Sequence, residues 1–440
     1  KRSKKLGFEI HEERIIAPEE IPATAKFNGY RDYDVQELRL ERHNIRFRLA
    51  EYVREDGSTL VGKVPPEYRQ GHYGPLLVGY ILYQHYQCRV PQPLIHEQLR
   101  EWGIDISTGQ LHRLLCENQE TFQAEQQQVL RVGLETATYV HTDDTGARHQ
   151  GHNGYCTVIG NADFTYFRTT ERKNRQSFLE TLQGESPCYV LNEYAQQYLQ
   201  SCPLAAKYWQ VLSFSSQVLA QDSAQWQTVL TTLGIVSPQA VRRVTEAALL
   251  GGVIEQGVDE RLVILSDGAP QFNVLVHALC WVHAERALRR LQGNTSQQRQ
   301  NIEEMQQQLW PYYQQLKTYA QAPTAERKQH LEQTFDQLFG RCFLHHASLN
   351  TVLQQFRAHK AELLRMLEVP QVPLHNNGAE SDIREYVTRR KISGGTRSEA
   401  GRRARDTLVG LKKTCRKLGI SFWQFLISRL RGDDQIPPLP

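Results

Sequence analysis

Three acidic residues in this sequence occupy positions suited to a shared carboxylate site. Asp143 comes at the end of the apolar run Thr136–Asp144, and Asp267 ends the short run RLVILSDG; both runs read as strands. Glu380 lies in a stretch with helical spacing. Since sites form where the strands of an α/β sheet end, the two aspartates are expected at one edge. Clustered carboxylates repel one another unless cations neutralise them, so the pattern predicts two Mg²⁺ or Mn²⁺ ions, a pair suited to phosphodiester displacement.

The helix expected to carry Glu380 has a polar face. Asn376, Asn377 and Arg384 stand at i−4, i−3 and i+4 from the glutamate, so all four share one side of the helix. We interpret this stripe as the edge of a polar site. A single acid at a strand end is more often a helix cap or an ion-pair partner, and only the combination of three acids favours a catalytic centre.

A strongly basic segment follows these residues directly. Arg384–Gly432 holds 14 of the 52 basic residues and three acidic ones, a net charge of +11 in a chain whose formal charge is +4. Such a one-sided cluster indicates a polyanionic partner, the alternative being a solvated helix surface. The glycines of Ser393–Ser398 (SGGTRS) would let the backbone approach phosphates closely. The residues expected to grip phosphates are Arg384, Arg389, Arg390, Lys391, Arg397, Arg402 and Arg403.

Composition limits the class of protein. With 440 residues, 40% hydrophobic and 23% charged, the chain is expected to fold into about three domains and not to be disordered. No apolar run approaches the roughly 18 residues of a membrane span, and no secretory signal is recognisable. The eight cysteines are scattered without a C-x-x-C pair, which argues against a disulfide framework or a zinc ribbon and favours a reducing cytosol.

The periodicity of the N-terminal third predicts two regions. Residues 1–67 read as a charged arm and a small β region, with strands over 34–66. Residues 68–134 read as helices that include a long one after the capping box of Ser107 and Gln110. These helices resemble a helix-turn-helix, although any helical bundle produces a similar pattern.

The rest of the chain alternates between predicted core segments and insertions. A strand meander and a short helix occupy 135–183, a strand leading into a helix occupies 260–291, and the final helices with the basic segment occupy 373–432, before a tail at 433–440. The two intervals between them, 184–259 and the Gln-rich 292–372, are expected to fold as helical modules outside the sheet. The first is acidic, so it is expected to contact protein and not DNA.

Several short motifs, taken together and in this order, resemble the transposases of bacterial insertion-sequence family 66. The first is Thr142-Asp143-Asp144-Thr145, with Asp144 in place of a glutamate, and the second is Asp267 in SDG. A C-x-x-H motif, Cys280 to His283, comes next, and the last block consists of Asn376, Asn377, Glu380, Arg384, Arg390 and Lys391.

The resemblance implies an α/β fold with an RNase H-like mixed sheet core, interrupted by helical insertions and preceded by a helix-turn-helix-like region and a small N-terminal β region. It implies a DDE-type enzyme in which Asp143, Asp267 and Glu380 are catalytic and hold two Mg²⁺ or Mn²⁺ ions. Supporting positions around them would be Asp144, Cys280, His283, Asn376 and Asn377. No zinc is expected, because C-x-x-H supplies only two of the four ligands that a structural zinc needs, and 31–67 contain no cysteine.

The implied function is cleavage of transposon ends and transfer of the 3′-OH to target DNA. The expected partner is double-stranded DNA, bound by a homo-dimer or a larger assembly at the bacterial nucleoid in the cytoplasm, away from membranes. Two alternatives stay open, a catalytically inactive transposon-derived DNA-binding protein and a carboxylate-dependent hydrolase. The sequence departs from the family pattern in the length of 185–259 and at Ile392, where an asparagine is expected.

Overall fold

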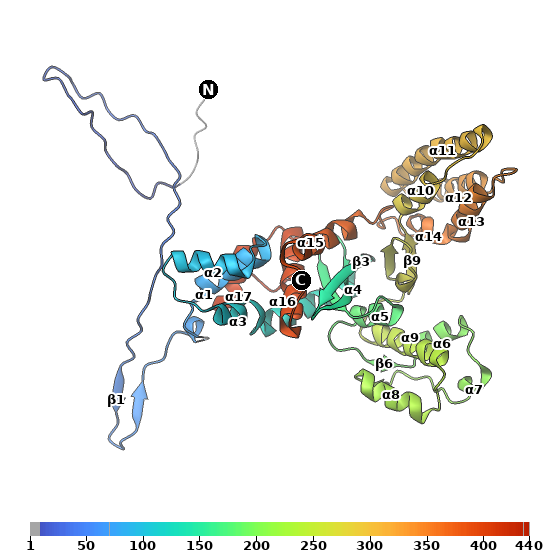
Figure 1. The fold of residues 1–440 in the computed structure, drawn as a ribbon, viewed down its shortest axis with the longest axis horizontal. Helices are drawn as coiled ribbons and strands as arrows, with labels where there is room; N and C mark the ends of the chain where they lie inside the picture. Colours follow the sequence, from blue (N-terminus) through green and yellow to red (C-terminus); the bar gives the residue numbers. More distant parts are fainter. Residues whose placement is uncertain (1–8, 70, 434, 440) are drawn as a thin grey trace. The chain divides into compact units, whose positions relative to one another are not determined.

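A computed structural model describes residues 9–69, 71–433 and 435–439 (Figure 1). The beginning of the expected arm, 1–8, and positions 70, 434 and 440 lie outside the described residues. The chain divides into two units, 1–44 and 45–440. The described part of the first unit, 9–44, has no helix or strand, and its side chains are exposed.

The small β region is shorter than the sequence predicts. Strands β1 (Glu51–Val53) and β2 (Thr59–Val61) form an antiparallel hairpin around a turn in which Gly57 has a φ of +80°. Residues 34–50 form no strand. Their apolar residues alternate correctly but stay exposed, and alternation without a face to bury does not stabilise a strand.

Residues 66–136 fold into helices, as expected, with one break. The capping box is confirmed, since Ser107 Oγ accepts from Gln110 N at 3.2 Å and Gln110 Oε1 accepts from Ser107 N at 3.1 Å. The predicted long helix is interrupted, because Asn118 has a φ of +56° and separates two shorter helices. The elements are η1 (Pro66–Tyr68), α1 (Pro75–Leu82), the π-helical η2 (Tyr83–Gln87), α2 (Gln92–Glu101), α3 (Thr108–Cys116) and α4 (Glu120–Thr136).

A mixed five-stranded sheet forms the centre of the second unit. Its order is β5-β4-β3-β8-β9, with antiparallel pairing among β5, β4 and β3 and parallel pairing from β3 to β8 and β9. The predicted three-strand meander is therefore confirmed. The strands are β3 (Tyr139–His149), β4 (His152–Gly160), β5 (Thr165–Thr170), β8 (Val263–Ser266) and β9 (Val276–Leu279), with η3 (Pro270–Phe272) between the last two.

The C-terminal helices cover β3, β4 and β5. Helix α15 (Asn377–Ser393) packs on β3 and β4, and α16 (Glu399–Lys417) packs on β5 (Figure 1). Helix α17 (Phe422–Arg431) packs on α1, so the end of the chain joins the N-terminal helices to the sheet. Apolar residues of these helices and of the sheet form one continuous core.

The first insertion, 184–259, is not purely helical and is not separate from this core. It contains a two-stranded sheet, and its helix α9 packs on α5 and α6 with Val244, Ala248 and Val253 fully buried. The insertion lies outside the five-stranded sheet, as predicted, but it is not the purely helical module expected, and α9 shares the main core. The elements around this region are α5 (Arg175–Leu182), β6 (Tyr189–Val190), α6 (Glu193–Gln200), α7 (Ala206–Trp209), β7 (Val218–Ala220), α8 (Ser223–Thr232) and α9 (Pro238–Glu255).

The Gln-rich insertion builds a second hydrophobic core of its own. Trp281 lies at its centre, with its ring centroid 5.7 Å from that of Tyr312 and 6.1 Å from that of Phe356. This core also contacts Val263, Leu265 and Ala278 of the sheet. The elements are α10 (Trp281–Arg289), α11 (Ser296–Gln321), α12 (Ala325–Phe339), α13 (Ala347–Ala358), α14 (Lys360–Leu363) and η4 (Arg365–Leu367). Among the described residues, no helix is long and apolar enough to cross a membrane.

Candidate active site

The strand register brings Asp143 and Asp267 to neighbouring positions. Strands β3 and β8 are parallel, with His141 opposite Leu265 as their last pair. Two residues further in the same register, Asp143 is level with Asp267, which follows the last residue of β8. Neighbouring strands lie about 5 Å apart, so the two carboxylates start from adjacent backbones. The sequence predicted that Asp143 lies at the end of its strand. This prediction is wrong, because β3 continues beyond Asp143 and pairs with β4 as far as His149.

Helix α15 brings Glu380 to these aspartates through a tight contact with β3. Asn376 is fully buried, and its Nδ2 donates to Thr142 O at 2.8 Å, while its backbone N donates to Cys280 Sγ at 3.2 Å. A β-carbon at Gly378 would lie 2.5 Å from His141 Cε1, so only glycine permits this approach. The start of α15 is thereby fixed beside the strand that carries Asp143.

The charges of the three acids act on one another. Burial, together with the nearby Asp267, Asp144 and Glu380, raises the pKa of Asp143 to about 6, although the hydrogen bond from Asp144 N to Asp143 Oδ1 (2.8 Å) opposes the shift. Asp267 and Glu380 therefore lie near enough to Asp143 for their charges to act on its carboxylate. Within the described ranges, however, no three His, Cys, Asp or Glu side chains lie close enough together to hold one metal ion.

Glu380 retains an unsatisfied oxygen beside His283. Its Oε1 is buried and has no hydrogen-bond partner in the described chain, and it lies 3.8 Å from His283 Nε2. Arg286 donates from Nη1 to the same imidazole nitrogen at 2.9 Å. An orphaned carboxylate oxygen is the kind of ligand that a hard cation takes, although one such oxygen does not by itself make a metal site.

Asp144 faces away from the triad, because successive strand residues point to opposite faces. Its carboxylate accepts from Lys173 Nζ at 2.7 Å and from Gln271 Nε2 at 2.7 Å. These two partners neutralise an acid that would otherwise add to the repulsion at Asp143. Asn377, the first residue of α15, is exposed.

Sequence reasoning missed a buried ionic cluster beneath the site. Asp382 lies 3.5 Å from His141 Nε2 and is paired with Lys413 at 3.2 Å and Lys417 at 2.8 Å. These cations contribute to a pKa for Asp382 well below its usual range, against the opposing effect of burial. The one sequence feature that pointed to Asp382 was its position two residues after Glu380, which places the two acids on different faces of the helix.

Much of the basic segment is used inside the fold. Arg389 is only 1% exposed, and its Nη2 donates to the carbonyls of His85 (2.6 Å) and Tyr86 (2.9 Å). This burial contradicts the expectation that Arg389 reaches phosphates, and we leave it out of the DNA interface. Lys412 is likewise buried and pairs with Glu385 at 2.6 Å.

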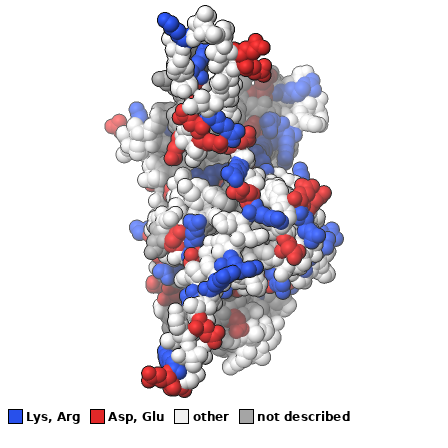
Figure 2. Space-filling model, turned by 90° about the vertical axis from the view of Figure 1, so that its left-hand side faces the viewer, with Lys and Arg blue, Asp and Glu red and all other residues white. Residues whose placement is uncertain are grey.

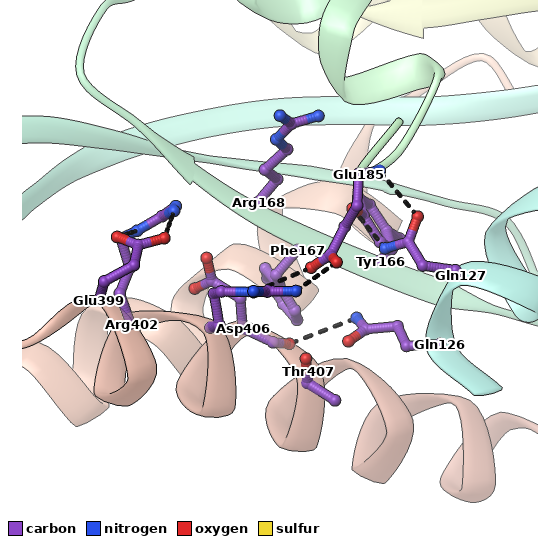
Figure 3. Close-up of a pocket in the computed structure, with 11 residues that line it drawn as sticks. Gln126, Gln127, Tyr166, Phe167, Arg168, Glu185, Glu399, Arg402, Asp406 and Thr407 are labelled. Carbon is purple, nitrogen blue, oxygen red and sulfur yellow. Dashed lines mark hydrogen bonds and ion pairs between the residues drawn. The ribbon is translucent and has the colours of Figure 1, made fainter. Parts of the chain in front are cut away.

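Two further arginines of the predicted DNA-binding set are paired with acids. Arg402 contacts Glu399, and Arg403 contacts Glu185, around a polar pocket of about 230 Å³. Figure 3 shows Arg402 beside Glu399 at this pocket, with Asp406 further along the same helix. Burial raises the pKa of Asp406 to about 6. The pocket therefore holds as many acidic as basic side chains, which argues against an anion site.

The remaining members of the predicted set lie at or near the surface. Arg384, Lys391 and Arg397 are exposed and Arg390 is partly exposed, and no carboxylate of the described chain pairs with any of the four within 4.0 Å. On the face drawn in Figure 2, basic and acidic side chains are interspersed and do not form one large patch. The candidates for contacting DNA are thus a few unpaired cations and not the whole segment.

Comparison with known proteins gives a family. The model of the family described as Transposase IS66 family matches residues 70–202 and 248–404, more than half of the chain. The interval between the two matched ranges lies within the first insertion, and residues 1–69 and 405–440 lie outside the match. A protein of Sinorhizobium fredii (strain NBRC 101917 / NGR234), described as Uncharacterized protein y4jO, is 41% identical over 321 residues, which cover 71% of this chain and 98% of that protein. The triad and the helices that position it fall within the matched ranges, and the chain belongs to the Transposase IS66 family.

Proposed function

We propose that this protein is a DDE-type DNA transposase that cleaves the ends of its element and joins the freed 3′-OH to target DNA. Membership of the Transposase IS66 family supports a transposase role and DNA as the partner. The observation that supports the catalytic part is the register that sets Asp143 level with Asp267, together with the charges of Asp267 and Glu380, which help to raise the pKa of Asp143. The sheet order β5-β4-β3-β8-β9, antiparallel and then parallel, supports an RNase H-like core.

The three acids would hold two Mg²⁺ or Mn²⁺ ions, which would supply charge stabilisation and activation of the attacking oxygen in phosphoryl transfer. The side chains around the acids prepare this site. Asn376 fixes the helix that carries Glu380, and His283 lies against the free oxygen of that glutamate. Lys173 neutralises Asp144, so the negative charge is confined to the face of β3 that carries Asp143.

DNA recognition by the N-terminal helices and assembly into a dimer or larger complex are part of the same proposal. Helices α2 and α3 follow one another across a short turn, and the first turn of α3 exposes Thr108 and Gly109, with Arg113 exposed further along. A helix presented in this way suits the major groove. Because an element has two ends, a transposase that joins both to one target is expected to act as more than one copy.

Strand cleavage tests the catalytic proposal. The substrate is a labelled duplex of the DNA that flanks the gene, incubated with the full chain and Mg²⁺, and cleavage with later strand joining is expected. Asp143→Asn, Asp267→Asn and Glu380→Gln should each abolish cleavage and leave DNA binding largely unchanged, because these acids hold ions and not phosphates. Glu326→Gln, at an exposed acid in the first turn of α12, is the matched control and should cleave normally.

Metal binding gives a readout that does not depend on activity. Thermal stability of the wild-type chain should rise with Mg²⁺ or Mn²⁺ concentration, because a ligand that binds only the folded state stabilises it. The rise should disappear in Asp143→Asn. An enzyme that cuts the duplex equally well in EDTA, or a Glu380→Gln variant that still cleaves, would remove the proposed mechanism.

A further inference from the structure

Asp267 lies on an exposed turn between β8 and η3, so burial does not fix the position of its carboxylate. Gly268 follows with a φ of +98°, and Ala269 N donates to Asp267 Oδ1 at 3.0 Å, which sets the side chain relative to its own turn. Asp267 therefore keeps its place beside Asp143 only if the turn as a whole is held. The contacts that hold this turn are part of the site.

Two side-chain contacts hold the far end of this turn. Gln271 Nε2 donates to the carboxylate of Asp144 at 2.7 Å, which ties η3 to β3. Arg175 Nη2 donates to Pro270 O at 2.8 Å, which ties the same turn to the first residue of α5. The first contact belongs to the sheet that carries the acids, and the second comes from the helix that leads into the first insertion.

Arg175 is itself held by the first insertion. Its Nη1 donates to Tyr198 Oη of α6 at 3.0 Å and lies 3.9 Å from Glu246 Oε2 of α9. The Tyr198 hydroxyl donates to the same Glu246 oxygen at 2.6 Å, so the phenol accepts from the arginine and donates to the carboxylate. Helices α6 and α9 pack together, and α9 packs on α5 (Figure 1). A continuous series of polar contacts therefore runs from the insertion to the turn of Asp267.

The series is charged and largely shielded from water. Glu246 is 7% exposed and Arg175 is partly buried, so removing either charge leaves the other without its partner where little water replaces it. Hydrogen bonds that involve ionised groups are also stronger than those between neutral groups. Glu246 has a second cation, Arg242, at 4.0 Å, but that side chain is 61% exposed and, within the described residues, makes no hydrogen bond to the turn.

We propose that Arg175 and Glu246 are positioning residues for the active site. Glu246, through Tyr198, orients Arg175, and Arg175 holds the turn that keeps Asp267 beside Asp143. The inference rests on the proposed transposase function and gives the first insertion a task within it. The interval between the two ranges that match the family, 203–247, includes Glu246, so part of the support of Asp267 comes from a segment that the family model does not match.

Hydrogen exchange of the full chain, without metal or DNA, tests the support of the turn directly. In Arg175→Gln and in Glu246→Gln, the hydrogen-bonded amides of 267–272 should exchange about fivefold faster than in the wild type, because the turn opens locally more often. These are the amides of Gly268, Ala269 and Phe272. Protection of β3 and β4 should stay near the wild-type value. Unchanged exchange of the turn in Arg175→Gln would overturn the proposal.

Two controls separate positioning from a general loss of stability. Arg242→Gln removes the exposed partner of Glu246 and should leave exchange of the turn unchanged. Trp226→Phe removes the hydrogen bond from Trp226 Nε1 to Thr245 Oγ1 (2.8 Å), so it weakens the insertion next to Glu246 without removing a contact of Arg175. It should speed exchange in α8 and α9 but not in 267–272. Equal acceleration of the turn in Trp226→Phe and Glu246→Gln would refute a specific series of contacts.

A double variant tests the order of the contacts. Since Glu246 is proposed to act through Arg175, Glu246→Gln should add less than about a twofold change in exchange of the turn once Arg175→Gln is present. Arg175→Lys keeps the charge but loses the guanidinium fork, so it should retain part of the protection that Arg175→Gln loses. Fully additive effects of Arg175→Gln and Glu246→Gln would show that the two residues act independently, contrary to the proposal.

Cleavage of the labelled duplex measures the consequence for the site. Arg175→Gln should need about threefold more Mg²⁺ than the wild type for half-maximal cleavage, because Asp267 is less often in place, and Arg242→Gln should match the wild type. A looser turn with an unchanged Mg²⁺ requirement would make Arg175 a purely structural contact and contradict its positioning role.

Failure of this inference is distinguishable from failure of the proposed function, because hydrogen exchange needs no catalysis. A protein that never cleaves, but whose turn loosens in Arg175→Gln and Glu246→Gln, keeps the support of the turn and refutes the transposase chemistry. A wild-type chain that cleaves in Mg²⁺, with a turn that neither variant loosens, keeps the chemistry and refutes the support.

Discussion

Asp143 illustrates how a partly buried carboxylate opposes folding. In the unfolded chain this acid titrates near its ordinary pKa of 3.8, and in the folded protein the pKa is raised to about 6. Folding therefore takes up a proton between these values, and the stability contributed by Asp143 falls as the pH rises through this window. Above pH 6 the folded protein carries the full cost of a charge that is partly buried beside two other acids.

Asp143→Asn should consequently stabilise the metal-free protein. At about 1.4 kcal/mol per pKa unit, and allowing for partial exposure, the gain in unfolding free energy at pH 7.5 is expected to be roughly 1–3 kcal/mol. Asn keeps the oxygen that accepts from Asp144 N, so the strand is not disturbed. Thermal melts in EDTA at pH 7.5 and pH 4 measure this, and the gain should shrink at pH 4. A variant less stable than the wild type at pH 7.5 would contradict it.

Arg389 and Arg390 are neighbours in sequence with opposite roles in the structure. Arg389 is buried over the ring of Tyr86, with its guanidinium carbon 5.0 Å from the ring centroid, whereas Arg390 is partly exposed and extends towards Gly146. Arg389→Gln should lower the unfolding free energy by about 2–4 kcal/mol, because the carbonyl of His85 loses this donor, the carbonyl of Tyr86 keeps only Lys412, and the packing on the Tyr86 ring is lost. Arg390→Gln should change it by less than about 0.5 kcal/mol. Denaturant melts of the two variants give the comparison.

This pair also shows what a sequence withholds at the level of single residues. Charge density predicted both arginines as surface residues, and nothing local separates them. The burial of Arg389 depends on carbonyls at positions 85 and 86, about three hundred residues away. The neighbouring positions of Asp143 and Asp267 were easier to predict, because both acids follow apolar runs that form strands of one sheet.

Among the elements, the contact of α15 with β3 decides the geometry of the site. Gly378 faces His141 so closely that an added β-carbon would lie 2.5 Å from the ring. Gly378→Ala should displace the start of α15 from the strand and move Glu380 away from Asp143. We expect strand cleavage to fall at least tenfold with secondary structure retained.

A second readout separates misplacement from general loss of stability. Mg²⁺ should raise the melting temperature of Gly378→Ala by less than it raises the melting temperature of the wild type. Gln227→Ala, at an exposed position of α8, is the control and should behave as the wild type. Normal cleavage by Gly378→Ala would show that the close approach is not needed.

The elements themselves were predicted unevenly, for physical reasons. Strands β3 to β5 and the capped start of α3 follow from local periodicity and hydrogen-bonding residues, and both predictions are confirmed. The break at Asn118 depends on one residue in the left-handed region, which helical periodicity does not reveal. The strands predicted over 34–50 are absent for the opposite reason. The apolar residues alternate as in a strand, but no other element buries them.

At the scale of the whole molecule, two hydrophobic cores organise the chain. The first joins the N-terminal helices, the sheet, α9 and the C-terminal helices, and the second joins α10 to α14 to one side of β8 and β9. The sequence indicated two insertions of similar kind. Only the packing distinguishes them, because the first insertion shares the main core through α9 and the second has its own centre.

Trp281 is the residue on which the second core depends. It is 1% exposed, and its Nε1 donates to Leu363 O at 2.7 Å. Its ring is surrounded by those of four other aromatic residues, Tyr312, Phe335, Phe339 and Phe356. Trp281→Ala removes a large buried side chain and leaves a buried carbonyl unpaired, so the expected loss is about 3–5 kcal/mol.

Because the two cores are separate, this loss should be local before it is global. Hydrogen exchange of Trp281→Ala should show faster exchange in α11, α12 and α13, with protection of β3, β4 and α16 close to that of the wild type. Trp310→Ala is the matched control, since this tryptophan belongs to the same module but is 47% exposed, and it should leave exchange unchanged. Equal loss of protection in both cores of Trp281→Ala would mean that the chain unfolds as one unit. Retained protection of the sheet would instead show that the α10–α14 module loosens without dismantling the strands that carry the acids.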